Sequence, residues 1–435
     1  MSGFELERYL EELQEFVDID SGSHDIAGLT IAAQWLEKKY DAVGMKTELR
    51  FLGENRRPIL IACSPAVSSD KKSEVLFIGH LDTVFPEGTV AERPFRISDG
   101  NAYGPGVADM KSGVLLTVYL AERFVRENPH IRLIAVHNCD EEIGSIDSEE
   151  LIKSLGAKTS YCFDMEPGRQ GRNFVKNRKG VAEYKISFKG RASHAGNAPE
   201  KGISAVRELA RWVYDTFPLN DASAGINVNV GVVSGGTASN VIPEFAECII
   251  DVRYTEMELL PEVEKKFMAM AAEPAVEGVI VKVEKLSGFP PMAADEKTDI
   301  MMDALLKAGE KTGQSFEFES VGGGSDGSLI SSVGTPVIDG CGPVGYMYHT
   351  PDEYMDISSI EERYSLLYEA INILMENDIA DESHYIVVLD LQILLLWLTA
   401  NKAEQGVCRS FLRDSGSGKR LTLRQAKRIL YIVHK

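Results

Sequence analysis

Five short segments between residues 80 and 349 carry side chains of the types that bind divalent metal ions. They contain His80 in IGHLDT, Asp109 in GVADMKSG, Glu141 and Glu142 in DEEIGS, Glu166 in FDMEP, and His349 in MYHTPDE. Imidazole nitrogens and carboxylate oxygens suit zinc and similar borderline metals. A pair of ions that shares one carboxylate needs a set of this kind. The sequence therefore predicts a two-metal hydrolase.

Each of these residues also has an ordinary explanation when it is taken alone. A histidine at the end of a strand, such as His80, is more often structural, and Asp109 before a helix is equally suited to cap that helix. The adjacent Glu141 and Glu142 suit a solvated acidic turn, and the other two ligands suit surface loops. Asp82 follows His80 by two residues, so both side chains point the same way and one can orient the other. The prediction rests on the joint placement of these residues.

Apolar runs that end at polar residues place these side chains on a common sheet. The predicted strands are 75–80, 131–138 and 161–164, with a helix over about 110–128 and two amphipathic helices before residue 42. Continuous apolar strands that alternate with helices predict an α/β fold, a mostly parallel sheet with helices on both faces. Ligands gather beyond the carboxyl ends of such strands. We therefore expect His80, Glu141, Glu142 and Glu166 to meet in one crevice.

From Gly180 the pattern changes to alternating strands separated by two helices. The expected elements are strands over 181–190, 226–236, 246–254 and 276–285, and helices near 204–217 and 256–272. Their order is that of a ferredoxin-like α+β unit. A helix over about 298–312, a Gly-rich turn, an apolar strand and a helix over about 358–376 follow. The predicted domains are a discontinuous catalytic domain, an inserted domain and an appended tail, with boundaries 1–178 plus 291–378, 179–290, and 379–435.

Composition narrows the class of protein. The net charge of −20 over 435 residues argues against a nucleic-acid partner and leaves no polybasic surface for a membrane. No basic and apolar leader opens the sequence, so we expect a cytoplasmic protein. Six cysteines without a CxxC pair indicate reduced thiols. The tail has no assigned role, and its stretch IVVLDLQILLLWL is too short to span a membrane.

Nine ordered segments resemble the di-zinc aminoacylase and exopeptidase family, which includes glutamate carboxypeptidase, peptidase T, acetylornithine deacetylase and succinyl-diaminopimelate desuccinylase. The segments are GHLDTV, YGPGVADMKSG, DEEIGS, MEPG, GRASHAG, ASNVIP, DVRY, GGGSD and YHTPDEY. The resemblance covers roughly residues 4–377. It implies two divalent ions, most often zinc, with cobalt or manganese as alternatives.

The resemblance also assigns roles to the metal-type residues. His80, Asp109 and Glu166 would hold one ion, and Asp109, Glu142 and His349 the other, with Asp109 as the bridge. A cis peptide bond is implied after Asp109. Zinc-bound water has a pKa of about 7 instead of about 15.7, so a hydroxide that bridges the ions is the implied nucleophile.

Further roles concern catalysis and assembly. Asp82 would orient the His80 ring, and Glu141 would be the general base that moves the water proton to the leaving amine. In relatives, the histidine that corresponds to His194 in GRASHAG reaches the active site of the other subunit. The inserted domain is therefore expected to act as a lid and to form a homodimer.

Substrate recognition is implied at four positions. Asn240 and Arg253 would hold a free carboxylate next to the scissile amide, and Arg172 and Gly323 would contact the rest of the substrate. Arg172 belongs to a basic cluster with Arg169, Lys176, Arg178 and Lys179, and this cluster is equally suited to a solvated hinge. Arg253 is equally suited to a surface ion pair. The second basic residue of glutamate-specific relatives is replaced by SGFPPM. The expected substrates are small peptides or N-acyl amino acids.

Two other functions fit parts of the sequence. The segment GGSDG has the G-x-S-x-G pattern, and Ser325, Asp339 and His349 follow the triad order of α/β serine hydrolases, with FEFES as the preceding strand. A peptide-binding protein without catalysis is the second alternative. The serine-hydrolase alternative leaves the remaining metal-type ligands unused. A non-catalytic protein of this kind normally lacks a metal ligand or the general base, and this sequence has all of them.

Overall fold

The computed structural model describes residues 4–65 and 74–376. The chain divides into two compact units, Met1–Ile371 and Asn372–Lys435, and the elements that build the candidate site belong to the first. The predicted tail, 379–435, lies outside the described residues.

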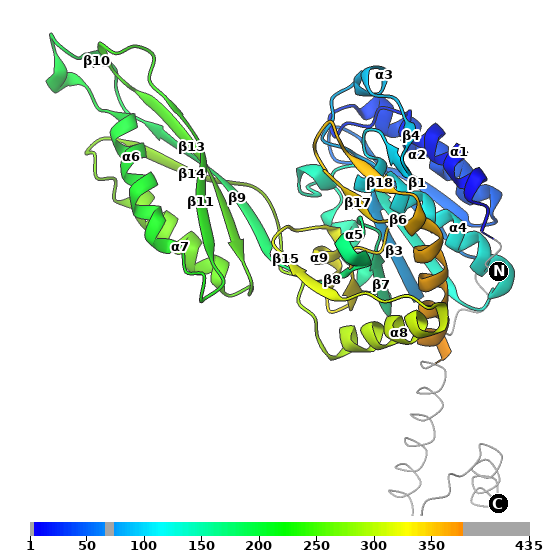
Figure 1. Cartoon of the computed structure of the whole chain (residues 1–435). Helices are drawn as coiled ribbons and strands as arrows, with labels where there is room; N and C mark the ends of the chain where they lie inside the picture. The colour runs from blue at the N-terminus through cyan, green and yellow to red at the C-terminus, as the bar shows by residue number, and fades with distance from the viewer. Residues whose placement is uncertain (1–3, 66–73, 377–435) are drawn as a thin grey trace, which may run out of the picture. The chain divides into compact units, whose positions relative to one another are not determined.

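The main sheet has six strands in the order β1-β2-β6-β3-β7-β16 (Figure 1). They are β1 (Lys46–Leu52), β2 (Arg57–Cys63), β3 (Glu74–His80), β6 (Arg132–Asn138), β7 (Tyr161–Asp164) and β16 (Val337–Ile338). β3 runs parallel to β6 and β7, and β16 runs parallel to β7, whereas β2 is antiparallel to both of its neighbours. The predicted, mostly parallel sheet is confirmed, and its three apolar strands are β3, β6 and β7.

Helices cover both faces of this sheet, as expected. They are α1 (Leu6–Val17), α2 (Ile26–Ala42), α4 (Ser112–Glu127), α5 (Glu149–Gly156), α8 (Glu296–Thr312), α9 (Asp326–Ser331) and the helical residues 358–371. α2 contacts β1 and β2, α4 contacts β3 and β6, and α9 contacts β3 and β7. Side chains alternate between the faces of a strand, so Leu76 and Ile78 pack in one core with Leu329 of α9, and Val75 and Phe77 face the opposite side.

Several short strands were not predicted. These are β4 (Arg96–Ser98), β5 (Asn101–Tyr103), β17 (Gly345–Tyr346) and β18 (Tyr354–Asp356), which form one sheet, and β8 (Phe174–Arg178), whose partner is β15 (Phe318–Val321). Runs of two to five residues are too short to show a clear period-2 pattern. β15 overlaps the FEFES segment, but its partner is β8 and it lies outside the main sheet. Within 4–65 and 74–376, no helix has both the length and the apolar character needed to cross a membrane.

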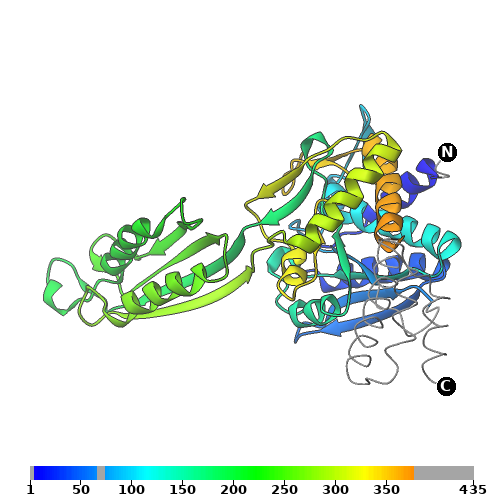
Figure 2. The ribbon, with the colours of Figure 1, turned by 90° about the horizontal axis from the view of Figure 1, so that it is seen from below.

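The inserted unit is a four-stranded antiparallel sheet with two helices, in the order β11-β13-β9-β14. Its elements are β9 (Gly180–Lys189), α6 (Ala205–Thr216), β11 (Asn227–Gly235), β13 (Phe245–Tyr254), α7 (Leu259–Ala272) and β14 (Ile280–Phe289). Buried and less buried residues alternate along β9 and β13, because the helices cover only one face. Figure 2 shows both helices on the same side of the sheet. The ferredoxin-like prediction is confirmed.

Trp212 of α6 is the largest fully buried side chain among residues 4–65 and 74–376, and it packs in the core of this inserted unit. Its ring lies 5.8 Å from that of Phe188 and 5.9 Å from that of Phe267, measured between centroids. We expect Trp212→Ala to lower the free energy of unfolding by about 3–5 kcal/mol in urea titrations, because it leaves a large cavity. The exposed Lys265→Ala change is the control, with an effect within about 0.5 kcal/mol. Equal small losses in both variants would contradict this account of the core.

Candidate metal centre

The carboxyl ends of three parallel strands bring the predicted ligands together. His80 is the last residue of β3, Glu141 follows β6 after a two-residue turn, and Glu166 follows β7 by two residues. Because parallel strands end at the same edge of the sheet, these side chains converge. Asp109 comes from the turn that precedes α4, and His349 comes from the loop between β17 and β18.

Two groups of side chains meet around Asp109. One carboxylate oxygen, Oδ1, lies 3.2 Å from Nε2 of His80, and the other, Oδ2, lies 3.3 Å from Nε2 of His349. Nε2 of His80 is also 3.7 Å from the carboxylate of Glu166, and Nε2 of His349 is 3.3 Å from that of Glu142. Each oxygen of Asp109 therefore faces one imidazole, which is the arrangement expected of a bridging carboxylate. The peptide bond between Asp109 and Met110 is cis, as expected.

Glu141 and Glu142 turn to different parts of the site. Glu141 lies 4.0 Å from Nε2 of His80, whereas Glu142 contacts His349. His349 has a φ of 60°, in the left-handed region that few residues other than glycine adopt. Such a conformation is typical of functional loops that the surrounding structure holds in place.

Asp82 lies behind this group and connects its parts. Its backbone oxygen is 2.9 Å from Nδ1 of His80, and its carboxylate is 3.5 Å from the same nitrogen. The carboxylate also accepts hydrogen bonds from the backbone N–H groups of Glu141 and Glu142, each at 3.2 Å. Asp82 is fully buried. It therefore fixes the His80 ring and the turn that carries both glutamates.

Glu353 holds the loop of Asp109 and was not singled out from the sequence. Its buried carboxylate accepts hydrogen bonds from the backbone N–H groups of Gly106 at 3.0 Å, Ala108 at 2.8 Å and Asp109 at 3.0 Å. The only sequence signal is its place in the YHTPDEY segment. The histidine loop thus supplies both a ligand-type side chain and the anchor for the opposite loop.

Glu353→Gln is expected to weaken metal binding by about 10–100-fold, as is typical for partners that orient ligands. The amide has one acceptor oxygen, and its NH2 group faces backbone donors instead of accepting from them. Competition with a chromophoric chelator measures the change, and the neighbouring exposed Asp352→Asn variant is the control. Unchanged metal affinity in Glu353→Gln would show that this carboxylate does not position the site.

The pKa values reflect crowded negative charge. Burial raises the pKa of Glu141 well above its usual range, and Glu166 and Glu142 add to this effect. Burial, together with the charge of Asp109, raises the pKa of Glu166 to about 8. Hydrogen bonds to Asp109 and Glu142 raise the pKa of His349 to about 10. Positive charge at this place is therefore favourable.

The donor set fits a pair of divalent ions. Donor atoms of His80, Asp109 and Glu142 lie within 4.8 Å of one another, and so do those of His80, Glu141 and Glu166. Neither group contains a cysteine, so the donors are nitrogen and oxygen alone, as in catalytic zinc and manganese sites. The second grouping contains Glu141, which the resemblance assigns to proton transfer.

A cavity of about 310 Å³ opens on these ligands. It is lined by Asp109, Glu141, Glu142, Glu166, Pro167, Arg169, Arg178, Gly324, Tyr348 and His349. Arg172, a predicted substrate residue, is not among them, because its guanidinium pairs with Glu362 and donates to Ser358 at 3.1 Å. Arg178 is buried and paired with Asp339, at 2.7 Å between Nη2 and Oδ1.

The other predicted substrate residues also lie outside the lining of this cavity. Arg253 on β13 donates to Asp251 at 2.9 Å and to the backbone oxygen of Gly322 at 3.1 Å, which fits the simpler ion-pair interpretation. Gly323 accepts at its backbone oxygen from Arg178. Asn240 accepts at its backbone oxygen from Ala195. Their contacts to a substrate stay predictions.

His194 and Asn240 lie together at one end of the inserted unit. His194 belongs to β10 (Ser193–His194), which pairs with β12 (Val241–Ile242). The imidazole is exposed, and its Nδ1 accepts hydrogen bonds from the backbone N–H groups of Gly196 and Asn197, both at 3.1 Å. Because Nδ1 accepts these two bonds, Nε2 is the ring nitrogen that carries the hydrogen and can donate.

The surroundings of Ser325 do not favour a serine hydrolase. Its fully buried hydroxyl contacts Asp164 at 2.9 Å and Asp339 at 2.7 Å. His349, the expected base of that triad, contacts Asp109 and Glu142 instead. A nucleophilic serine needs a base within hydrogen-bond reach.

The fold and the paired imidazole and carboxylate groups define a metal-dependent hydrolase. Residues 76–373 match the model of peptidase family M20/M25/M40, so the match covers more than half of the chain. The chain belongs to this family, and its activity is metal-dependent hydrolysis of an amide bond.

Two relatives span most of this chain. Carboxypeptidase G2 of Pseudomonas sp. (strain RS-16) is 30% identical over 377 residues, which cover 84% of this chain and 88% of that protein. Succinyl-diaminopimelate desuccinylase of Nitrosomonas eutropha is 30% identical over 316 residues, which cover 68% of this chain and 81% of that protein.

Solved structures share the fold. Aminopeptidase PepT from Bacillus cereus superposes with a TM-score of 0.66 at 23% identity, covering 85% of this chain and 99% of that chain. The M20 family metallo-carboxypeptidase Sso-CP2 from Sulfolobus solfataricus superposes with a TM-score of 0.68 at 16% identity, covering 84% of this chain and 99% of that chain.

Proposed function

We propose that this protein is a zinc-dependent exopeptidase or N-acyl-amino-acid hydrolase that cleaves an amide bond next to a free carboxylate. The observation that carries the proposal is that Asp109 presents one oxygen to His80 and the other to His349. Glu141 lies at the same cavity. One relative is named a carboxypeptidase, an enzyme that removes a C-terminal residue, and the other a desuccinylase, which removes a succinyl group from an amine.

The residues divide the reaction between them. His80, Asp109 and Glu166 would hold one ion, and Asp109, Glu142 and His349 the other. Two divalent ions lower the pKa of water and polarise a carbonyl oxygen. Glu141 accepts the proton of the attacking water and passes it to the leaving amine, which requires it to lie within hydrogen-bond reach of both. Asp82 keeps the His80 ring in position.

Arg169, instead of Arg172, is the proposed substrate contact from this basic stretch, and its proposed ligand is a carboxylate. Arg169 lines the cavity, and within the described residues its buried Nε has no hydrogen-bond partner. Its guanidinium lies 5.7 Å from the centre of the Tyr348 ring. Arg178 is committed to Asp339. A guanidinium whose Nε lacks an acceptor, beside the reacting centre, is suited to bind a carboxylate.

The inserted unit, 179–290, is proposed to be a lid that forms a homodimer, and the protein is proposed to act in the cytoplasm. His194 does not line the cavity described above, yet its Nε2 is prepared to donate a hydrogen bond. Delivery of this donor to the cavity of a second subunit would stabilise the oxyanion. Cys139, Cys162, Cys248 and Cys341 are free thiols, which fits a reducing compartment.

Mixing two inactive variants tests this use of His194. A His194→Ala subunit paired with a Glu141→Gln subunit has one complete site, formed by Glu141 of the first and His194 of the second. Random pairing in equal amounts is expected to restore roughly a quarter of the wild-type rate, since half of the dimers are mixed and each has one complete site. Each variant alone at the same concentration is the control. No recovery on mixing, with dimers present, would mean that His194 does not act across subunits.

The proposed activity is tested with a panel of dipeptides and N-acyl amino acids. We expect hydrolysis that is lost with a chelator, regained with zinc, and absent for matched amides whose carboxylate is blocked as a methyl ester. If the amide bond of the methyl esters were hydrolysed at the same rate, the substrate would not need a free carboxylate. Hydrolysis that resists the chelator and stops with a serine-directed phosphonate would overturn the metal-dependent proposal.

A further inference from the structure

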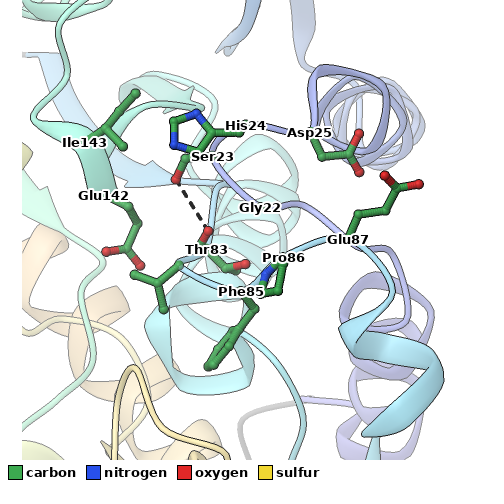
Figure 3. A pocket seen from close by; sticks show the side chains of 11 residues that line it. Gly22, Ser23, His24, Asp25, Thr83, Phe85, Pro86, Glu87, Glu142 and Ile143 are labelled. Atoms are coloured by element: carbon green, nitrogen blue, oxygen red, sulfur yellow. Dashed lines mark hydrogen bonds between the residues drawn. The ribbon is translucent and has the colours of Figure 1, made fainter.

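A second cavity, of about 470 Å³, shares Glu142 with the metal centre (Figure 3). We propose that this cavity is the subsite for the acyl half of the substrate, and that it accepts an apolar acyl group ending in a cation and rejects one ending in a carboxylate. The inference rests on the proposed function and goes beyond it by naming the class of acyl group.

The two main walls of the cavity are held rigidly against each other. One wall is the segment 22–25 before α2, and the other is the segment 83–87 after β3. Gly22 and Thr83 form a parallel bridge, and Ser23 donates its backbone N–H to Thr83 at 3.1 Å. A Cβ atom on Gly22 would lie 2.3 Å from the backbone oxygen of Phe85, so only glycine permits this approach.

The same walls are fixed relative to the metal ligands. Ser23 donates from its hydroxyl to the Asp82 carboxylate at 2.8 Å, and that carboxylate accepts from the backbone N–H of Glu142 at 3.2 Å. A group that binds in the cavity is thereby held at a defined distance from the reacting amide. Holding a substrate in a fixed geometry near the catalytic groups raises the rate of its reaction.

The lining combines an apolar surface with acidic groups. Val84, Phe85, Pro86 and Ile143 supply the apolar part. Asp25 and Glu87 both line the cavity, and in the view of Figure 3 they are on the side away from Glu142 and Ile143. The lining contains no lysine or arginine, and His24 is its single basic residue. Two arginines contact lining residues without lining the cavity themselves. Arg57 donates to the backbone oxygen of Ser23, and Arg93 lies 4.6 Å from the centre of the Phe85 ring.

The charges of the two cavities assign the two halves of the substrate. Arg169 lines the cavity that opens on the proposed metal ligands, and it is suited to bind the carboxylate of the amine half. The acyl half then extends past Glu142 toward Asp25 and Glu87. An ammonium group at the end of the acyl half gains from these carboxylates, whereas a second carboxylate is repelled by them.

Three substrates with the same amine half test the proposal. Their acyl groups are 4-(aminomethyl)benzoyl, 4-methylbenzoyl and 4-carboxybenzoyl, which share one aromatic body. We expect kcat/KM to fall in that order, with roughly tenfold between the two charged ends, and the difference to shrink in high salt because the carboxylates are near the surface. Glu87→Lys is expected to reverse the order of the two charged substrates. Glu92→Lys, on the adjacent helix α3 (Thr89–Glu92) and outside the lining, is the matched control and should keep the order.

The outcomes separate this inference from the proposed function. Chelator-sensitive hydrolysis of all three substrates at equal kcat/KM, or an order that Glu87→Lys leaves intact, would overturn the subsite while the proposed activity stands. If none of the three substrates is hydrolysed, the proposed activity fails for aromatic acyl groups. The binding of the free aromatic acids to the zinc-loaded protein is then compared by calorimetry. Tighter binding of 4-(aminomethyl)benzoic acid than of terephthalic acid, lost in Glu87→Lys, would support the subsite, and equal binding would reject it.

Discussion

Glu141→Gln is expected to lower kcat by about 10²–10⁴-fold, the usual contribution of a positioned general base. Glutamine keeps the size of the side chain and its place in the turn that Asp82 holds, but it cannot accept the proton of water. The folded structure and the two-ion content should persist, since the proposed ligands are other residues. Stopped-flow or steady-state rates with the best substrate of the panel, together with metal analysis of the same sample, measure the change.

Glu150→Gln is the matched control for this prediction. Glu150 lies in α5, a few residues further along the chain, and its side chain is exposed. We expect it to retain wild-type rates. A Glu141→Gln enzyme that retained most of its turnover would show that another group moves the proton. Loss of metal from the same variant would instead make Glu141 a ligand, as its grouping with His80 and Glu166 also permits.

Asp109→Asn is expected to lower kcat/KM by about 10²–10⁴-fold and to lower the metal content from two ions to one. The carboxylate has one oxygen for each imidazole group, and the amide has only one oxygen donor. Loss of one ion removes several kcal/mol of transition-state stabilisation, and each 1.36 kcal/mol corresponds to tenfold in rate.

Metal content is measured by elemental analysis after extensive dialysis, with Asp299→Asn as the control. Asp299 lies exposed in the first turn of α8 and should not change either quantity. Two tightly bound ions in Asp109→Asn would contradict the bridging role. Unfolding of the variant is monitored by circular dichroism, so that loss of metal is separated from loss of structure.

The sequence predicted the elements whose patterns are long and regular. β3, β6 and β7 are continuous apolar runs that end at polar residues, and those ends are where His80, Glu141 and Glu166 meet. The alternation along β9 and β13 predicted the inserted sheet, because one face packs on helices and the other does not. The pattern of apolar residues, continuous or alternating, was sufficient to predict these elements.

Contacts between distant loops could not be predicted in this way. Glu353 accepts hydrogen bonds from a loop about 245 residues away, and nothing in its local sequence distinguishes it from a surface acid. Arg172 was the predicted substrate contact, yet Glu362 and Ser358 engage its guanidinium, whereas Arg169 lines the cavity. Such choices depend on partners supplied by tertiary structure.

The central claim is that Asp109 bridges two metal ions. Anomalous scattering at the zinc edge, from crystals of the zinc-loaded protein, tests it most directly. We predict two peaks about 3.5–4 Å apart, one beside His80 and Glu166 and the other beside Glu142 and His349, with Asp109 between them. A single peak, or peaks away from these side chains, would contradict the account.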